Sequence, residues 1–277
     1  MDERGYAKSV NEHYAQRQGI GEAILSGLQA DGKDIDNLSP RDLAAVDQSH
    51  SRGLEATLDL AEMAGVHSGQ SVLDVGGGLG GAARVLAAEF GCRVTVLDLT
   101  KEYCRAGEML TARIGLGDQV TFKVGSALDM PFPDASFDVV WTQHSSMNIS
   151  NKERLYSEAH RVLRPGGRLA LHEVMAGPEQ PIHFPVPWAT TQEINFMRSP
   201  EEIRTLILES GFREVAWVDV TQVTRERLQQ RAAAGAPPTA LGPHILLGEK
   251  VGAAYRNVPI NLDERRLEIV EAVFDKE

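Results

Sequence analysis

The chain has 277 residues, which is long enough to bury one substantial core. Its formal net charge is −11. Nucleic acid and anionic lipid are disfavoured as partners, because an acidic surface repels both. The sequence shows no apolar run near the roughly 20 residues that span a bilayer, and no apolar signal core at the N-terminus. Cys92 and Cys104 are the two cysteines, and no His or Cys pair has metal-ligand spacing. We therefore expect a cytoplasmic protein without a bound metal.

Residues 1–47 are polar and carry scattered apolar positions, and residues 53–64 fit a helix with one apolar face. Such a pattern predicts short helices that pack on the rest of the chain. Ser39 and Pro40 mark a helix start, with the serine as N-cap and the proline at the first helical position. We expect residues 1–60 to form an N-terminal helical cap and residues 61–277 to form the main domain.

From residue 71 onward, short apolar runs alternate with helical stretches. The expected strands cover residues 71–75, 93–98, 120–124, 137–141, 168–173, 215–220 and 266–274. The expected helices between them cover residues 81–90, 101–114, 151–163, 199–209 and 222–234. The final stretch is also compatible with a helix. This alternation predicts a doubly wound α/β domain with a mostly parallel sheet, and residues 176–198 predict a lid.

Three glycines directly follow the first expected strand, at Gly76, Gly78 and Gly80. They allow a sharp turn and leave bare amides at the carboxyl end of the strand, where open α/β sheets bind ligands. Asp98 ends the second expected strand, where a carboxylate accepts both hydroxyls of a ribose. The pattern is compatible with a dinucleotide or with S-adenosylmethionine (SAM). Asp74 favours SAM, because a carboxylate there repels a diphosphate and attracts an ammonium group.

Further motifs extend the pattern beyond the glycine turn. They read VLDVGGGLGG at residues 72–81, MPFPDASFDVV at 130–140 and EAHRVLRPGGRL at 158–169. With these motifs the chain resembles class I SAM-dependent methyltransferases. Residues 38–40, 47–57 and 185–189 make it similar to the small-molecule group that includes the sarcosine/dimethylglycine N-methyltransferases.

The resemblance implies a Rossmann-like, seven-stranded sheet whose last strand is antiparallel. It also implies a set of cofactor contacts, matched by position: Tyr14, Asp74, Gly76, Gly78, Asp98, Leu99, Ser126, Ala127 and Gln143. Tyr14 would close over the cofactor from the cap. Ser126 stands where many relatives have aspartate, which weakens the expected contact to the adenine amine.

His144 and His50 are the candidates for a catalytic base, because histidine accepts a proton near neutral pH. A role for His144 in shaping the pocket is about as plausible, and His50 also fits a capping or packing role. We expect His172, in the middle of a strand, to be structural. His183, Trp188 and Phe196 in or beside the lid are expected to contact substrate, although anchoring the lid is an equally good interpretation of Trp188.

Arg52 and Arg198 fit a substrate carboxylate, although a solvated arginine is the commoner case. The predicted function is transfer of a methyl group from SAM to a small-molecule amine, hydroxyl or carbon nucleophile by in-line displacement. The alternatives are an NAD(P)-dependent oxidoreductase and a non-catalytic SAM-binding protein. A homodimer is compatible with the sequence.

Overall fold

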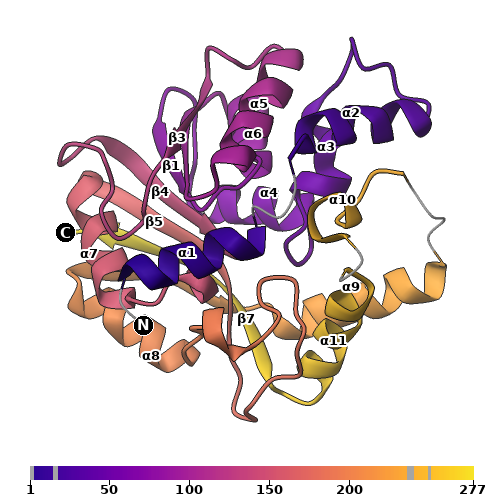
Figure 1. The fold of residues 1–277 in the computed structure, drawn as a ribbon. Helices are drawn as coiled ribbons and strands as arrows, with labels where there is room; N and C mark the ends of the chain where they lie inside the picture. Colours follow the sequence, from indigo (N-terminus) through magenta and orange to yellow (C-terminus); the bar gives the residue numbers. More distant parts are fainter. Residues whose placement is uncertain (1–2, 15–17, 236–239, 249–250) are drawn as a thin grey trace.

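The computed structural model describes residues 3–14, 18–235, 240–248 and 251–277. A seven-stranded sheet with the order β3-β2-β1-β4-β5-β7-β6 forms its centre, and helices cover both faces (Figure 1). The strands are β1 (Ser71–Val75), β2 (Arg93–Asp98), β3 (Val120–Val124), β4 (Phe137–Gln143), β5 (Leu163–Ala176), β6 (Phe212–Asp219) and β7 (Leu267–Lys276).

Strands β1 to β5 pair in parallel, whereas β7 is antiparallel to both β5 and β6. The predicted doubly wound sheet with an antiparallel last strand is therefore confirmed. The chain order reverses between β1 and β4, which lie side by side at the centre of the sheet. Ligands of open α/β sheets bind at such a reversal, outside the carboxyl ends of the strands.

Two strand boundaries differ from the sequence prediction. β5 begins at Leu163 rather than at residue 168, because Leu163 already pairs with Phe137 across a register shift. Pro165 and the glycines after it, which look like a turn in the sequence, lie within this irregular part of the strand. β6 begins at Phe212 because its partner β7 extends as far as Lys276. The last stretch is a strand and not a helix.

The helices before the central part of the sheet are α1 (Glu3–Tyr14), α2 (Ile20–Ala30), α3 (Pro40–Asp47), α4 (Leu54–Met63), α5 (Gly81–Phe90) and α6 (Lys101–Arg113). Those that follow are η1 (Ser146–Asn148), α7 (Lys152–Val162), η2 (Gln192–Ile194), α8 (Pro200–Glu209), α9 (Thr221–Ala234), α10 (His244–Leu247) and α11 (Val251–Asp263). The expected start of α3 is present, since the N–H and Oγ of Ser39 both lie within 2.9 Å of an Asp42 carboxylate oxygen.

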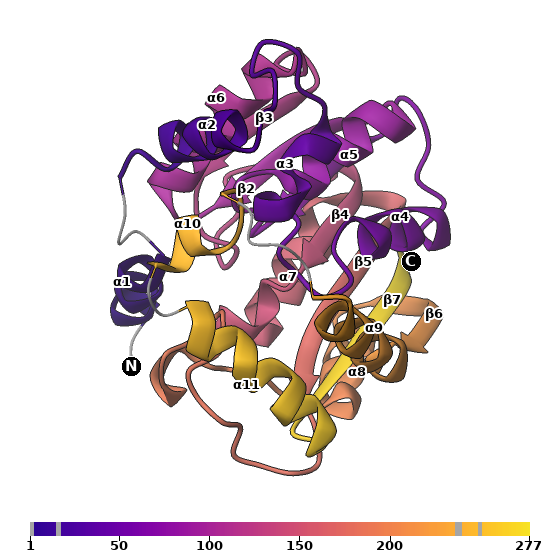
Figure 2. The same cartoon turned by 90° about the vertical axis from the view of Figure 1, so that its right-hand side faces the viewer.

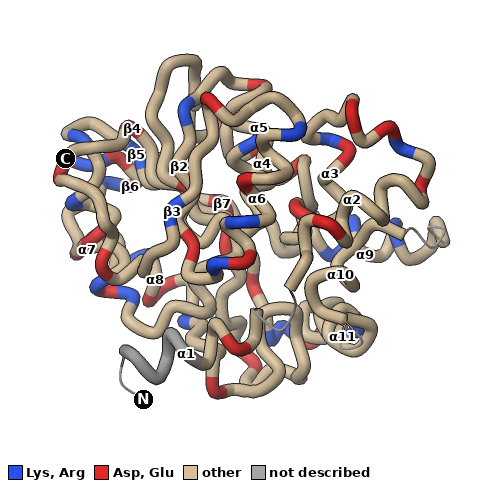
Figure 3. The backbone as a smooth tube through the Cα atoms, turned by 45° about the horizontal axis from the view of Figure 1, so that its top comes forward, with Lys and Arg blue, Asp and Glu red and all other residues tan. Residues whose placement is uncertain are grey.

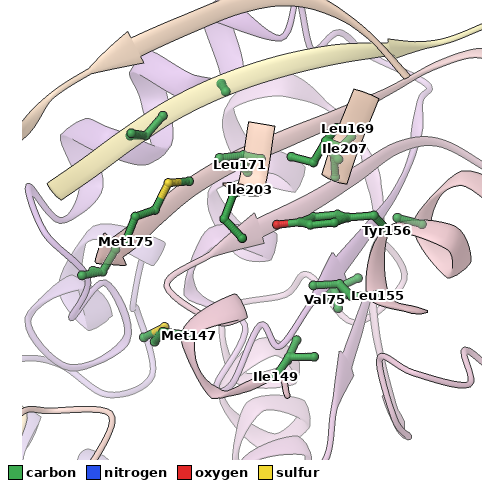
Figure 4. Close-up of a cluster of buried hydrophobic side chains, with 14 of the residues drawn as sticks. Val75, Met147, Ile149, Leu155, Tyr156, Leu169, Leu171, Met175, Ile203 and Ile207 are labelled. Atoms are coloured by element: carbon green, nitrogen blue, oxygen red, sulfur yellow. The ribbon is translucent and has the colours of Figure 1, made fainter. Parts of the chain in front are cut away.

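The sheet buries apolar side chains on both faces, because successive side chains point to opposite faces and helices cover both. Leu169 and Leu171 face Tyr156 of α7 and Ile203 and Ile207 of α8 (Figure 4). The intervening Ala170 belongs to a second cluster, which α4 and α5 cover. A third cluster joins α2 and α3 to α6 and to the start of α10. The first helices therefore share apolar packing with the main domain, and the division at residue 60 stays a prediction.

A late segment of the chain, around α10, packs against the early helix α2. Figures 1 and 2 both place α10 next to α2, and α11 lies nearby. Leu241 and Ile245 pack in the same cluster as Ile20 and Ile24. Acidic and basic residues are interspersed along the described backbone (Figure 3). Within the described ranges, no helix has the length and apolar character needed to cross a membrane.

Candidate functional site

A cavity of about 1300 Å³ opens at the carboxyl ends of β1, β2 and β4. Segments from α1, α9, α10 and α11 form its opposite side. Most of the residues predicted from the sequence line it, namely Tyr14, His50, Asp74, Gly76, Gly78, Asp98, Leu99, Ser126, Ala127, Gln143, His144 and Trp188. The fold thus brings together residues that are up to 174 positions apart in the chain.

The glycine turn between β1 and α5 requires its glycines for two reasons. Gly78 has φ +56°, a left-handed conformation that side chains other than glycine rarely adopt. A Cβ on Gly77 would lie 2.4 Å from Oδ2 of Asp74. The backbone therefore passes directly over a buried carboxylate and presents bare amides to the cavity.

The carboxylate of Asp98 is fixed by two backbone amides. Gly78 N–H donates to Oδ2 over 2.9 Å, and Thr100 N–H donates to Oδ1 over 2.7 Å. Burial raises the pKa of Asp98 above its ordinary value, and these amide donors oppose the rise. Each carboxylate oxygen keeps a further lone pair. A pair of vicinal hydroxyls, as on a ribose, fits this arrangement.

Asp74 lies at the end of β1 and is only 1% exposed. Its Oδ2 has no hydrogen-bond partner in the described part of the chain. Burial and, to a lesser degree, the charge of Asp98 raise the pKa of Asp74 to about 7, while Arg84 acts in the opposite direction. A buried carboxylate with an unused oxygen is costly unless a cation pairs with it. The site therefore fits a ligand with an ammonium group.

Leu99, Ser126 and Ala127 line the neighbouring part of the cavity, after β2 and β3. Leu99 and Ala127 pack against the main apolar cluster and offer flat apolar contact. Ser126 Oγ accepts the N–H of Leu128 over 3.1 Å. Its hydroxyl proton and a second lone pair stay available for the polar edge of a base.

Three histidines gather beside the glycine turn, at positions 50, 144 and 172. The rings of His144 and His172 have centroids 4.8 Å apart, and Ser51 Oγ lies 2.9 Å and 3.0 Å from their Nε2 atoms. Burial lowers the pKa of all three rings, to about 4 for His50. All three are therefore neutral at pH 7. No group of His, Cys, Asp or Glu side chains among the described residues is arranged to hold a metal ion.

A chain of hydrogen bonds determines which nitrogen of each ring carries the proton. Trp141 has only an N–H to give, and it donates to Gln143 Oε1 over 3.0 Å. The amide nitrogen of Gln143 therefore faces Nδ1 of His172, at 3.5 Å, and His172 carries its proton on Nε2. That proton points at Ser51, whose hydroxyl then donates to Nε2 of His144.

His144 consequently carries its own proton on Nδ1. No hydrogen bond joins Nδ1 to the described residues, and the half-buried ring lines the cavity. His50 differs, since its Nε2 lies 2.8 Å from Gln48 Oε1 and its Nδ1 lies 3.3 Å from the carbonyl oxygen of Ser51. Of the two histidines predicted as catalytic, His144 is the one with a ring nitrogen available to a ligand.

Asn148 joins the lid to the N-terminal helix. Its amide nitrogen donates to the carbonyl oxygens of Trp188 and Ile194, both over 2.9 Å, and its Oδ1 accepts the hydroxyl of Tyr14 over 2.7 Å. The indole N–H of Trp188 donates to Asn195 over 3.0 Å. Tyr14 and Trp188 are thus fixed as walls of the cavity.

Two residues predicted to contact substrate do not line the cavity. His183 is exposed, and its Nε2 lies 2.7 Å from Glu264, which directly follows α11. Phe196 packs against the main apolar cluster and donates its backbone N–H to Met147. The structure gives neither residue a route to a ligand in this cavity, because each is turned toward other protein groups.

Ser51, Asn148 and His172 belong to the site but were not predicted. The signal for His172 lies in the sheet register, because β4 and β5 pair Gln143 with His172. A histidine in mid-strand becomes part of the site only when its neighbouring strand is known. Ser51 lies in a turn and Asn148 ends the short helix η1, and no periodic pattern in the sequence indicates a role for either side chain.

Known methyltransferases are similar to this chain in sequence. Residues 73–171 match the family model described as "Methyltransferase domain". A sterol 24-C-methyltransferase from Eremothecium gossypii is 43% identical over 41% of this chain and 31% of its own length. A sarcosine/dimethylglycine N-methyltransferase from Halorhodospira halochloris is 31% identical over 54% of each chain. The chain therefore spans between about a third and about half of the length of these relatives.

The fold extends the similarity over almost the whole chain. The structure of geranyl diphosphate C-methyltransferase from Streptomyces coelicolor A3(2), solved with Mg²⁺, geranyl-S-thiolodiphosphate and S-adenosyl-L-homocysteine, has a TM-score of 0.70 at 19% identity and covers 98% of both chains. Residues 73–171 thus match a methyltransferase domain, and the structural likeness shows that the whole chain shares the fold. The predicted resemblance to SAM-dependent small-molecule methyltransferases, the sarcosine/dimethylglycine enzymes among them, is confirmed.

Proposed function

We propose that the protein transfers a methyl group from SAM to a small-molecule acceptor. The observation that carries the proposal is the unpaired, buried carboxylate oxygen of Asp74 beside the glycine turn. It matches the ammonium group of the methionyl part of SAM, while Asp98 matches the ribose hydroxyls. A diphosphate in the same place would meet the charges of both carboxylates.

The methyl group of SAM is already activated, so the protein's contribution is to position the acceptor and exclude water. Tyr14, Asn148 and Trp188 hold one wall of the cavity. His144 donates from Nδ1 to a lone pair of the acceptor that does not attack, and so orients the reacting atom. The attacking lone pair forms the bond to the methyl carbon, the methyl–sulfur bond breaks and S-adenosylhomocysteine leaves, and an amine or hydroxyl acceptor releases its proton to solvent. Ser51 and His172 act through His144, because they keep its proton on Nδ1. In this scheme His144 positions the acceptor as a donor and is not the base.

Replacement of His144 separates the role of a hydrogen-bond donor from the role of a base. The amide nitrogen of asparagine stands close to the position of Nδ1, and asparagine tolerates the φ of +48° at this position. We expect H144A to lower kcat about 100-fold, because the acceptor loses the group that orients it, and H144N to lower it less than about tenfold. Steady-state kinetics with saturating SAM measures both, and melting curves control for folding. Equal losses in the two variants would contradict the donor role.

The proposal as a whole is tested by incubating the protein with methyl-labelled SAM and a panel of amine, phenol, alcohol and carbon acceptors. Mass spectrometry is expected to find the label in at least one acceptor. The label should be absent with the D98A variant. Tight binding of SAM without transfer to any acceptor would favour the alternative of a non-catalytic SAM-binding protein.

The remaining predictions on partners and location are part of this proposal. Cys92 and Cys104 are both buried and free, which supports a reducing compartment such as the cytoplasm. The net charge of −11 supports a small molecule rather than nucleic acid as partner. The homodimer stays a prediction, and analytical ultracentrifugation measures it.

A further inference from the structure

We propose that the acceptor is a bulky, largely apolar molecule, bound in the part of the cavity between β5, β7, α9 and α11. This inference rests on the proposed methyltransferase function and names the acceptor class. Neither the motifs nor the glycine turn indicates that class. The shape and lining of the cavity beyond His144 carry the argument.

The floor of this acceptor subsite continues from the histidine cluster along the sheet. Val174 lies two residues after His172 in β5 and therefore on the same face of the strand. In β7, Ile269 pairs with Val174, and Leu267 lies two residues before it. All three side chains line the cavity. An apolar floor thus begins beside the group that we expect to orient the reacting atom.

The remaining walls combine partly buried apolar side chains with polar ones. Thr224 contributes a buried hydroxyl, and the other polar side chains of α9 and α11 are exposed, apart from the partly buried Tyr255. Leu228 of α9 and Val258 of α11 line the cavity and are partly buried against the same apolar cluster as the floor. Met147 and Trp188 complete the enclosure on the lid side. The indole nitrogen of Trp188 is already hydrogen-bonded to Asn195, so the ring offers only its apolar surface. Binding here removes mainly apolar surface from water.

A small zwitterion of the sarcosine type needs a cationic partner for its carboxylate. The buried arginine of the cavity, Arg52, does not offer one, because it is already paired with carboxylates of the protein. Arg52 lies 2.7 Å from Glu271 and also bonds Asp59, and its side chain is 7% exposed. Arg198 pairs with Glu153 outside the cavity. Three arginines on α9 and α11 also line the cavity, namely Arg227, Arg231 and Arg256, and all are exposed to solvent, where water screens their charge. Arg227 is in addition paired with Glu55.

The size of the cavity also favours a bulky acceptor. A pocket for one drug-sized ligand measures roughly 300–1000 Å³, whereas this cavity measures about 1300 Å³. One nucleoside cofactor at the glycine turn leaves the apolar half free. An acceptor the size of sarcosine would leave that half filled with water against apolar walls, which is unfavourable.

Titration of the S-adenosylhomocysteine complex tests the inference without requiring turnover. Farnesol and 1-naphthol serve as apolar probes, and sarcosine serves as the small zwitterion. We expect calorimetry to detect binding of both apolar probes and no binding of sarcosine at millimolar concentration. Because S-adenosylhomocysteine affinity is measured first, a failure of the proposed function is distinguished from a failure of the acceptor class.

Two substitutions on the same helix provide a matched pair. V258F adds a ring where the side chain lines the subsite, whereas I260F adds it at a position that is 43% exposed and outside the cavity. We expect V258F to weaken farnesol binding at least about tenfold and I260F to leave it within twofold. Both variants should bind S-adenosylhomocysteine like the unmodified protein. Tighter binding of sarcosine than of either apolar probe, or equal farnesol affinity in the two variants, would overturn the inference.

Discussion

Replacing Asp98 with alanine is expected to weaken S-adenosylhomocysteine binding at least about 100-fold. The carboxylate is held by the amides of Gly78 and Thr100 and presents both oxygens to the cavity. Two hydrogen bonds from ribose hydroxyls to a charged acceptor contribute about 1.5–3 kcal/mol each, and about 3 kcal/mol corresponds to a factor of about 100 in affinity. Isothermal titration of the purified variant measures the change.

D118A is the matched control for this substitution. Asp118 is an exposed carboxylate just before β3 and lies outside the cavity. The control should bind S-adenosylhomocysteine within twofold of the unmodified protein. Circular dichroism establishes that both variants are folded. Retained affinity in a folded D98A variant would show that Asp98 is not a cofactor contact.

Replacing Asp74 with asparagine is expected to stabilise the free protein and to weaken cofactor binding. Without a ligand, this buried carboxylate has an unpaired oxygen and a pKa raised to about 7 by burial and by Asp98. An ionised Asp74 at pH 8 costs up to about 4 kcal/mol of folding free energy. The asparagine amide is neutral but also leaves a buried group unpaired, so we expect a net gain of about 2 kcal/mol. The melting temperature should then rise by about 5 °C.

The sign of this effect depends on pH. The folded state of Asp74 has the higher pKa, so the folded protein binds this proton more firmly than the unfolded chain. Stability from this group is therefore lost as the pH rises from about 4 to about 7. The D74N variant should lose this dependence, and the two melting temperatures should converge at pH 5. Binding of S-adenosylhomocysteine at pH 8 should weaken about tenfold in D74N, because the ammonium loses its partner.

A higher melting temperature with unchanged affinity would show that Asp74 is buried for a reason other than cofactor binding. A lower melting temperature at pH 8 would show that the carboxylate is paired in the free protein. D118N is the control for the change of charge, and it should move neither quantity.

The cofactor half of the site follows from local sequence, and for that reason it could be predicted. A strand, a glycine turn and a helix are adjacent in the chain, so Asp74, Gly76 and Gly78 lie together whatever the rest of the molecule does. Asp98 ends the next strand, and parallel pairing of β1 with β2 brings it to the same edge. The alternation of strands and helices also predicts the order of elements through β4.

The acceptor half depends on contacts that no local pattern encodes. α10 and α11 were not predicted, because Pro243 and Pro259 interrupt the stretch and a proline inside a helix is unfavourable. Pro259 nevertheless lies within α11, where packing against α9 and β7 outweighs local propensity. The register of β5 with β4 places His172 next to Gln143. Ser51, in the segment before α4, contacts His172 through its hydroxyl. His183 and Phe196 stand near the lid in sequence but face away from the cavity.

The central claim is that two carboxylates and a glycine turn form a receptor for a cationic nucleoside. Titration of the unmodified protein with S-adenosylhomocysteine and, separately, with NADH tests it most directly. We expect one S-adenosylhomocysteine to bind per chain and NADH neither to bind nor to compete. Binding of NADH with no binding of S-adenosylhomocysteine would contradict the account and favour a nicotinamide-dependent oxidoreductase.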